Sequence, residues 1–392
     1  MPKVVIAEVD RTSAEAPQYN DYVVLLPGHS PNLVNGQEDL FYTTAKFHEV
    51  AGEYSSADPK PISYRIAEYL LDLGMTILWV EVDDPTTLES SDFWEKYQDK
   101  GQYDLRFIFS PEYRSQTTAQ YMIKCAGVRG DAVALVDIPD PAESGEDEFD
   151  LDYINHFIES LTVSDIVISG HDNENPFKYA ACFSQNVSFK GEDAELPGSF
   201  AYLSAFAKHI NRFPAWFAMA GSIRGVLPFE KVSTSYKFST AEIDNLQDRE
   251  TADKKAVNVI TEVRPYGNII WGNRTLYPLT RGDDGSLGLR ASNFLNIRQL
   301  CCDLKKLLFR VSRQYTFEPN SDVLWTNFKN SITPLLEEMK SGQGIRGYKI
   351  VKVATTKKAT LKAKIIIIPI EAVEDFDLTV ELSDSISVTE EE

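Results

Sequence analysis

The first half of the chain alternates between short apolar runs and segments with helical periodicity. Apolar runs predict strands at 22–26, 75–82, 105–109, 132–138 and 165–169. Helices are predicted between and after them, because segments with helical patterns lie at 62–73, 115–127, 151–161 and 200–211. Strands that alternate with helices in this way are typical of an α/β layer with largely parallel strands.

The second half follows a different pattern, in which two long amphipathic helices come first and two strands follow. The first helix is predicted over 292–313 with Ser292 as its N-cap, and one of its sides is apolar. The second is predicted over 321–340, where Pro334 predicts a kink. The two strands are predicted at 348–353 and 361–368. Four consecutive Ile residues in the last strand favour burial on both faces.

Both ends of the chain carry strand patterns outside these regions. Val4 and Ile6 share one face of a short apolar segment near the start. Beyond Pro369, polar residues alternate with an apolar set formed by Phe376, Leu378, Val380 and Leu382. A terminal strand of this kind can pair with a sheet edge of another chain or dock on its own domain.

These patterns divide the chain into four predicted parts. They are an N-terminal arm (1–20), an α/β domain (21–250), an α+β domain with two helices packed on a sheet (251–371) and a C-terminal arm (372–392). Length supports more than one domain, since 392 residues exceed an ordinary single core.

Charge separates the second domain from the rest. Residues 256–371 hold 18 Lys and Arg against 9 Asp and Glu, which is +9, whereas the whole chain has 39 against 59, which is −20. Everything outside the segment therefore sums to −29. A split of this size indicates two surfaces with different partners.

The basic segment also contains recognisable motifs. In chain order they are Val257-Asn-Val-Ile-Thr-Glu-Val-Arg264, Ile270-Trp-Gly-Asn-Arg-Thr-Leu276, Phe294-Leu-Asn-Ile-Arg298, Phe317-Glu-Pro-Asn320 with Trp325, Gly347-Tyr-Lys-Ile350 and Ile367-Ile-Pro369. Upstream, Phe213-Pro-Ala-Trp-Phe-Ala-Met-Ala-Gly-Ser-Ile-Arg-Gly225 precedes them. This order resembles the C-terminal region of contractile phage tail sheath proteins, which R-type bacteriocins and other contractile injection systems share. The pattern departs at Arg298-Gln299, where a pair of Arg is usual.

The resemblance implies a structural subunit and no enzyme. Such subunits stack as hexameric rings around a tail tube, and they contract to drive the tube through an envelope. It implies an outer α/β domain, an inner tube-facing domain, and strand arms that link subunits. The implied partners are further copies of the chain, the tail tube, the baseplate and the tail terminator, and the implied location is a virion tail assembled in the host cytoplasm. A bacteriocin or injection-system sheath is an equally open interpretation.

A basic face on the first helix of the second domain is the predicted contact with the tube. It comprises Arg298, Lys305, Lys306, Arg310 and Arg313, most of them opposite the apolar stripe. Solvation is the ordinary alternative for such a face. Nucleic acid is a second alternative, although the net charge of −20 would repel a polyanion.

Candidate chemistry is sparse, so a cytosolic α/β enzyme is the weaker hypothesis. The sequence has no G-x-x-x-x-G-K-[ST] motif, and Asp137 after an apolar run is expected to cap or enter a loop. The five His residues lack metal-ligand spacing, and the four Cys residues include no C-x-x-C pair. No catalytic residue, cofactor or metal is predicted, and without a run of about 18 apolar residues no membrane insertion is expected.

Overall fold

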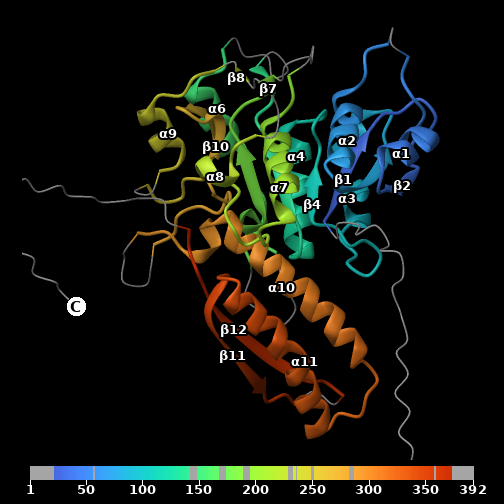
Figure 1. Ribbon diagram of the computed structural model, residues 1–392, viewed down its shortest axis with the longest axis vertical. Coiled ribbons are helices and arrows are strands. Elements are labelled where there is room, and N and C mark those ends of the chain that lie inside the picture. Colours follow the sequence, from blue (N-terminus) through green and yellow to red (C-terminus); the bar gives the residue numbers. More distant parts are fainter. Residues whose placement is uncertain are drawn as a thin grey trace, which may run out of the picture.

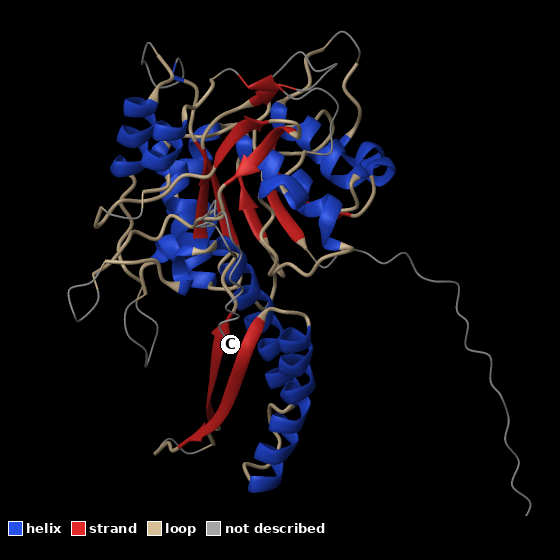
Figure 2. Cartoon of the chain, turned by 60° about the vertical axis from the view of Figure 1, so that its left-hand side comes forward, coloured by secondary structure: helices blue, strands red, loops and turns tan. Residues whose placement is uncertain are grey.

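The computed structural model describes residues 22–55, 58–141, 148–166, 174–188, 195–227, 233–234, 236–248, 251–281, 287–356 and 359–372. Two parts are evident in Figures 1 and 2. An α/β domain forms the body, and two helices with a two-stranded sheet extend from it. We call this extension, residues 295–369, the projecting unit.

A six-stranded sheet forms the centre of the body, in the order β2-β3-β1-β4-β5-β6. The edge strand β2 is antiparallel to β3, and the other neighbours are parallel. The strands are β1 Val23–Gly28, β2 Glu38–Phe41, β3 Thr76–Glu81, β4 Phe107–Phe109, β5 Val133–Asp137 and β6 Ala180–Phe183. The predicted parallel-rich α/β layer is therefore confirmed.

Helices cover both faces of this sheet, because alternate residues of each buried strand point to opposite sides. The first face packs against α1 (Thr44–Ala51), α2 (Ile62–Asp72) and α7 (Gly198–Ile210). The second packs against α3 (Ser91–Lys96), α4 (Gln116–Arg129) and α6 (Leu151–Ser160). The body is thus a three-layer structure with two apolar cores.

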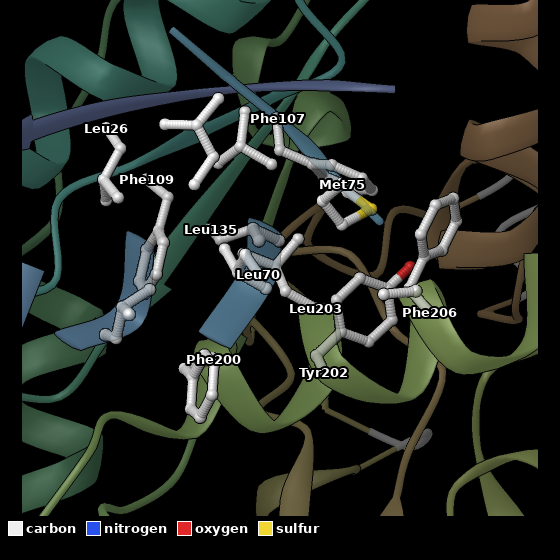
Figure 3. Close-up of a cluster of buried hydrophobic side chains, with 14 of the residues drawn as sticks. Leu26, Leu70, Met75, Phe107, Phe109, Leu135, Phe200, Tyr202, Leu203 and Phe206 are labelled. Atoms are coloured by element: carbon white, nitrogen blue, oxygen red, sulfur yellow. The ribbon is translucent and has the colours of Figure 1, made fainter. Parts of the chain in front are cut away.

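Aromatic side chains fill much of the first core. Phe107 and Phe206 meet edge to face, with ring centroids 5.0 Å apart (Figure 3). Leu135 from the sheet and Leu203 from α7 lie in the same cluster. Burial of such side chains is worth roughly 1.5–3 kcal/mol each relative to exposure, so this core holds α7 on the sheet.

Two details of the body differ from the sequence-based expectation. At 165–169, Ile166 makes only an isolated antiparallel bridge to Glu174, and 167–173 lie outside the described residues. The edge position is taken instead by β6, whose short Ala-Ala-Cys-Phe sequence gives little strand signal. Smaller elements complete the body, namely η1 (Pro85–Glu89), η2 (Pro176–Tyr179), β7 (Val187–Ser188), β8 (Ser233–Thr234), α8 (Gly221–Arg224) and α9 (Thr240–Leu246).

The hairpin of β9 (Val259–Val263) and β10 (Gly267–Trp271) belongs to the body by its packing. Ile260 and Ile270 are buried in the first core, and Ile270 donates its N–H to the carbonyl of Gly225 at 2.9 Å. The expected division at residue 251 therefore does not coincide with a change in packing. The chain leaves the body further on, after η3 (Ala291–Asn293).

The projecting unit contains α10 (Leu295–Gln314), α11 (Asp322–Ser341), β11 (Ile345–Val353) and β12 (Lys362–Pro369). Helix α10 begins three residues later than predicted, with Phe294 and not Ser292 before its first turn. Helix α11 agrees with the prediction, since Ser321 caps it and Pro334 lies inside it. A small separate core of Leu300, Leu304, Leu336, Met339 and Ile345 joins helices and strands.

Candidate functional site

The projecting unit is attached at the amino ends of the body strands. Asp104 and Arg106 directly precede β4, Tyr179 directly precedes β6, and all three contact α10. Parallel strands present their amino ends at one edge of a sheet, so these side chains form a single polar seat for the helix. We call this surface the α10 seat.

The first two basic residues predicted to face a tube lie in this seat. Arg298 is only 7% exposed, and its guanidinium carbon lies 4.4 Å from the ring centroid of Tyr179. Lys305 donates a hydrogen bond to the phenol oxygen of Tyr179 at 2.7 Å, and that phenol donates to Glu174 at 2.6 Å. The expectation that Arg298 and Lys305 form an exposed face is therefore wrong.

The remaining three basic residues differ among themselves. Lys306, 12% exposed, forms an ion pair with Asp104, and Arg310 binds the other oxygen of this carboxylate at 2.8 Å. Arg313 is exposed and lies over the ring of Phe309. The prediction of an exposed face is wrong for Lys306 as well. Arg310 and Arg313 are exposed, and their contact with a tube stays a prediction. The periodicity of a helix shows which side is basic. It does not show whether that side contacts solvent or an acidic residue from a distant part of the chain.

These pairings change the protonation behaviour of the groups. Burial lowers the pKa of Lys305, and the neighbouring Arg298 lowers it further. Burial also lowers the pKa of Lys306, against the opposing effect of Asp104. For Asp104, burial alone would raise the pKa, but Lys306 and Arg310 hold it below its ordinary value. The carboxylate therefore stays charged and keeps both contacts over the neutral range.

A fully buried arginine forms the centre of the seat. Arg106 donates to the side-chain oxygen of Gln299 at 2.6 Å, to the backbone oxygen of Gln299 at 2.8 Å and to Asp303 at 2.7 Å. Burial raises the pKa of Asp303, and the charge of Arg106 opposes that rise. Sequence reasoning missed this group, because Arg106 and Asp303 are separated by almost 200 residues.

On the other side of the junction, a tryptophan from the body packs on the base of the projecting unit. Trp216 donates its indole N–H to the carbonyl of Gly342 at 2.8 Å. A side chain added at Gly342 or Gly344 would come within 3.0 or 3.1 Å of the indole. The two glycines therefore allow close approach of the ring. Trp216 lies in one quoted motif, but nothing in that motif indicated its partner.

The two strands of the projecting unit have one covered face and one open face. Ile365 and Ile367 pack on the small core, together with Tyr348 and Ile350. Ile366 and Ile368 point the other way and are 41% and 56% exposed. The expectation of a strand covered on both faces is therefore wrong for this chain. Beyond its pairing with β11, β12 has no other strand beside it in the described part of the molecule.

Both predicted arm strands fall outside the described residues. Val4 and Ile6 precede residue 22, and Phe376, Leu378, Val380 and Leu382 follow residue 372. Their pairing stays a prediction. The last described residues are held at the base of the sheet, where Ile370 donates its N–H to Gly344 at 3.1 Å.

At the opposite edge of the body sheet, where the strands have their carboxyl ends, the buried Glu81 carboxylate has partners within the fold. The imidazole Nδ1 of His29 lies 2.8 Å from Glu81 and 3.2 Å from Asp83, so the three residues offer grouped ligand atoms. However, Glu81 also accepts hydrogen bonds from both the amide and hydroxyl of Ser30 and from the indole of Trp79. These contacts give the buried carboxylate a structural role, in which it holds the residues that follow β1 next to the end of β3.

A cavity of about 700 Å³ lies at the same edge and is lined by Tyr113, Arg114 and His156 among others.

The buried Asp137 accepts a hydrogen bond from the amide of Ser199 at 2.8 Å, at the start of α7. Asp137, the last residue of β5, therefore binds the first turn of a helix that is distant in the sequence, whereas the N-cap position of α7 is Pro197. Among the described helices, none has the length and apolar composition that crossing a bilayer requires.

Comparison with known proteins gives one consistent result. A scan against protein-family models finds no match, and neither does a search of curated proteins. Among solved structures, the sheath complex of the extracellular contractile injection system PVC, in its contracted state, aligns with a TM-score of 0.69 at 13% identity. That alignment covers 98% of each chain.

Two further solved structures of sheath proteins also align with this chain over most of its length. The contracted helical sheath of the anti-feeding prophage aligns with a TM-score of 0.65 at 15% identity, over 97% of this chain and 98% of the other. A sheath tail protein from Desulfitobacterium hafniense aligns with a TM-score of 0.54 at 9% identity, over 94% and 100%. The chain thus has, over nearly its whole length, the fold of the contractile sheath proteins.

Proposed function

We propose that this protein is the subunit of a contractile sheath, which polymerises around a tube and shortens to drive the tube through a target envelope. The shared fold supports this proposal, because it extends over both the body and the projecting unit. The proposed role is structural and needs no cofactor or catalytic residue.

The observation that carries the proposal is the incomplete sheet of the projecting unit. Within the residues that the structure describes, β11 and β12 form a two-stranded sheet with two outer edges. A two-stranded hairpin is marginal by itself, and exposed edges attract further strands. The same chain has two arms with strand patterns, one at each end. Exchange of these arms between copies would complete each sheet and link the subunits.

The geometry of such links suits a helical polymer. An arm donated by one copy and received by the next is a heterologous contact, and contacts of this kind continue into open stacks unless the rotation closes a ring. We propose stacked hexameric rings, in which exchanged strands keep subunits attached while other contacts are rebuilt. Contraction is then a transition between two packings of the same subunits and requires no nucleotide.

The proposed partners are further copies, a tail tube, a baseplate and a tail terminator. One structural neighbour is part of the anti-feeding prophage baseplate, and aligns with a TM-score of 0.64 at 15% identity. Phage tails, bacteriocins and injection systems all remain consistent with this fold. For the tube contact, we retain only Arg310 and Arg313 on the outer part of α10, because these two side chains are exposed whereas Arg298, Lys305 and Lys306 are mostly buried against the body. Arg310 would take part while also paired with Asp104.

Truncation after Ala372 tests the role of the C-terminal arm. The truncated protein is expected to remain folded and soluble, because the described body and projecting unit are intact, but to lose polymerisation. Negative-stain electron microscopy and sedimentation of purified full-length and truncated protein measure this. Sheath-like tubes of normal length from the truncated chain would refute the arm exchange.

The N-terminal arm has its own test. An electron microscopy map of the polymer should show residues 3–9 as a strand in a shared sheet, since both faces of that segment are apolar. A map in which 3–9 is disordered would contradict the proposal. Small compact oligomers whose melting temperature depends on a ligand would instead favour the enzyme alternative.

A further inference from the structure

The open face of the β11–β12 sheet combines apolar and basic side chains. The ladder pairs Lys349 with Ile366, Val351 with Lys364 and Val353 with Lys362, on the side opposite the small core. Lys349, Lys362, Lys364 and Ile366 are all exposed. This face is therefore basic as well as apolar, and we call its three lysines the lysine row.

The C-terminal arm has the complementary charge. From Glu371 to Glu392 the chain contains nine Asp and Glu residues and no Lys or Arg. In 376–382 the apolar residues occupy even positions. Asp375, Asp377 and Glu381 occupy odd positions, so in a strand they would share one face.

We propose that the lysine row recognises the acidic face of a C-terminal arm from a second copy, and so selects which strand enters the sheet and which way its sides point. This inference rests on the proposed arm exchange and adds the residues that give it specificity. An entering strand would extend the small core with Phe376 and Leu378 on the covered side. On the open side its carboxylates would lie beside Lys362 and Lys364.

Charge pairing favours one orientation because alternate residues of a strand point to opposite faces. A shift of one residue would therefore exchange the acidic and apolar faces of the arm. If the arm entered with its sides exchanged, its carboxylates would meet the apolar core and its aromatic ring would meet the lysines. Opposite charges on neighbouring strands stabilise a sheet, whereas like charges destabilise it. The row therefore favours one orientation and rejects basic segments of the same chain.

The direction of the chain fits pairing with a second copy. After β12, Ile370 continues the ladder by donating its N–H to Gly344, and the Glu371 carboxylate lies 3.7 Å from the Arg346 guanidinium. These contacts extend the chain past the end of the hairpin in the direction of β12. Pairing with its own β12 would require a hairpin turn between Glu371 and Phe376, whereas pairing with another copy requires no turn.

Charge reversal in two separate variants tests the proposal. The first carries Lys362→Glu and Lys364→Glu, and the second carries Asp377→Lys and Glu381→Lys. Each variant alone is expected to raise the protein concentration needed for polymerisation by roughly tenfold or more, because paired charges become like charges. Light scattering and negative-stain microscopy measure this. A control with Lys329→Glu and Lys340→Glu, at exposed positions of α11, has the same net charge as the first variant and should polymerise like the unmodified protein.

Mixing the two variants identifies the source of the arm. In an equal mixture, the reversed rows can accept the reversed arms of the other variant, so polymerisation is expected to recover. Recovery only when all four substitutions lie in one chain would show that the arm binds its own sheet, which overturns the second-copy assignment. Unchanged polymerisation of the first variant, while truncation after Ala372 abolishes tubes, would overturn the lysine row and leave the arm exchange intact.

Discussion

Replacement of Arg106 by Met examines whether the α10 seat holds the projecting unit on the body. The methionine keeps much of the side-chain volume but removes the three hydrogen bonds to Gln299 and Asp303. A buried acceptor without a donor costs about 1–3 kcal/mol. Removing one member of a buried ion pair costs about 3–5 kcal/mol. Because Asp303 remains 17% exposed, we expect a loss of about 3 kcal/mol in the free energy of unfolding.

Urea unfolding of purified protein, followed by circular dichroism, measures this loss. Arg264→Met is the matched control, since Arg264 is 90% exposed and its replacement should change stability by no more than about 0.5 kcal/mol. Hydrogen exchange should locate the effect in α10 and in the residues that precede β4. Equal stability of the two variants would refute the conclusion that Arg106 anchors the helix.

The same variant has a predicted pH dependence. The folded-state pKa of Asp303 is already raised by burial, and loss of Arg106 removes the charge that opposes this rise. A carboxyl group whose pKa is higher in the folded state contributes stability below its unfolded pKa and loses it as pH rises through the folded pKa. The deficit of Arg106→Met should therefore shrink between neutral pH and about pH 4. A deficit that stays constant over that range would show that Asp303 is not responsible.

Three further substitutions test other contacts. Lys306→Glu places a second carboxylate beside Asp104 and should lower the free energy of unfolding by about 1–3 kcal/mol. An unchanged free energy of unfolding would show that the side chain at this position is solvated. Trp216→Ala should cost about 2–4 kcal/mol and increase hydrogen exchange where α11 meets β11; protection equal to that of the unmodified protein would exclude the docking role. Gly225→Ala brings a methyl group to 2.7 Å from the carbonyl of Ile270 and should lower the melting temperature by several degrees, with an unchanged value counting against this close packing.

Local patterns determined most elements of this protein. Apolar runs located β1, β3, β4 and β5, because strands buried on both faces are apolar throughout. The predicted helical ranges 115–127 and 321–340 begin at the serines that cap α4 and α11, whose hydroxyls accept hydrogen bonds from amides of the first turn. The one N-cap predicted by name, Ser292, was wrong. The motifs between Phe213 and Pro369 pointed to the sheath fold, which the structural comparisons confirm.

Contacts between distant segments could not be read in the same way. The basic side of α10 was visible in the sequence. Its burial depends on Asp104 and Arg106, which lie about 200 residues away in the sequence, and on Tyr179, which lies more than 100 residues away. The open face of β12 shows the same limit, because four consecutive Ile residues do not reveal how many layers cover them. Periodicity reports which sides of an element differ, and only the tertiary arrangement decides what each side meets.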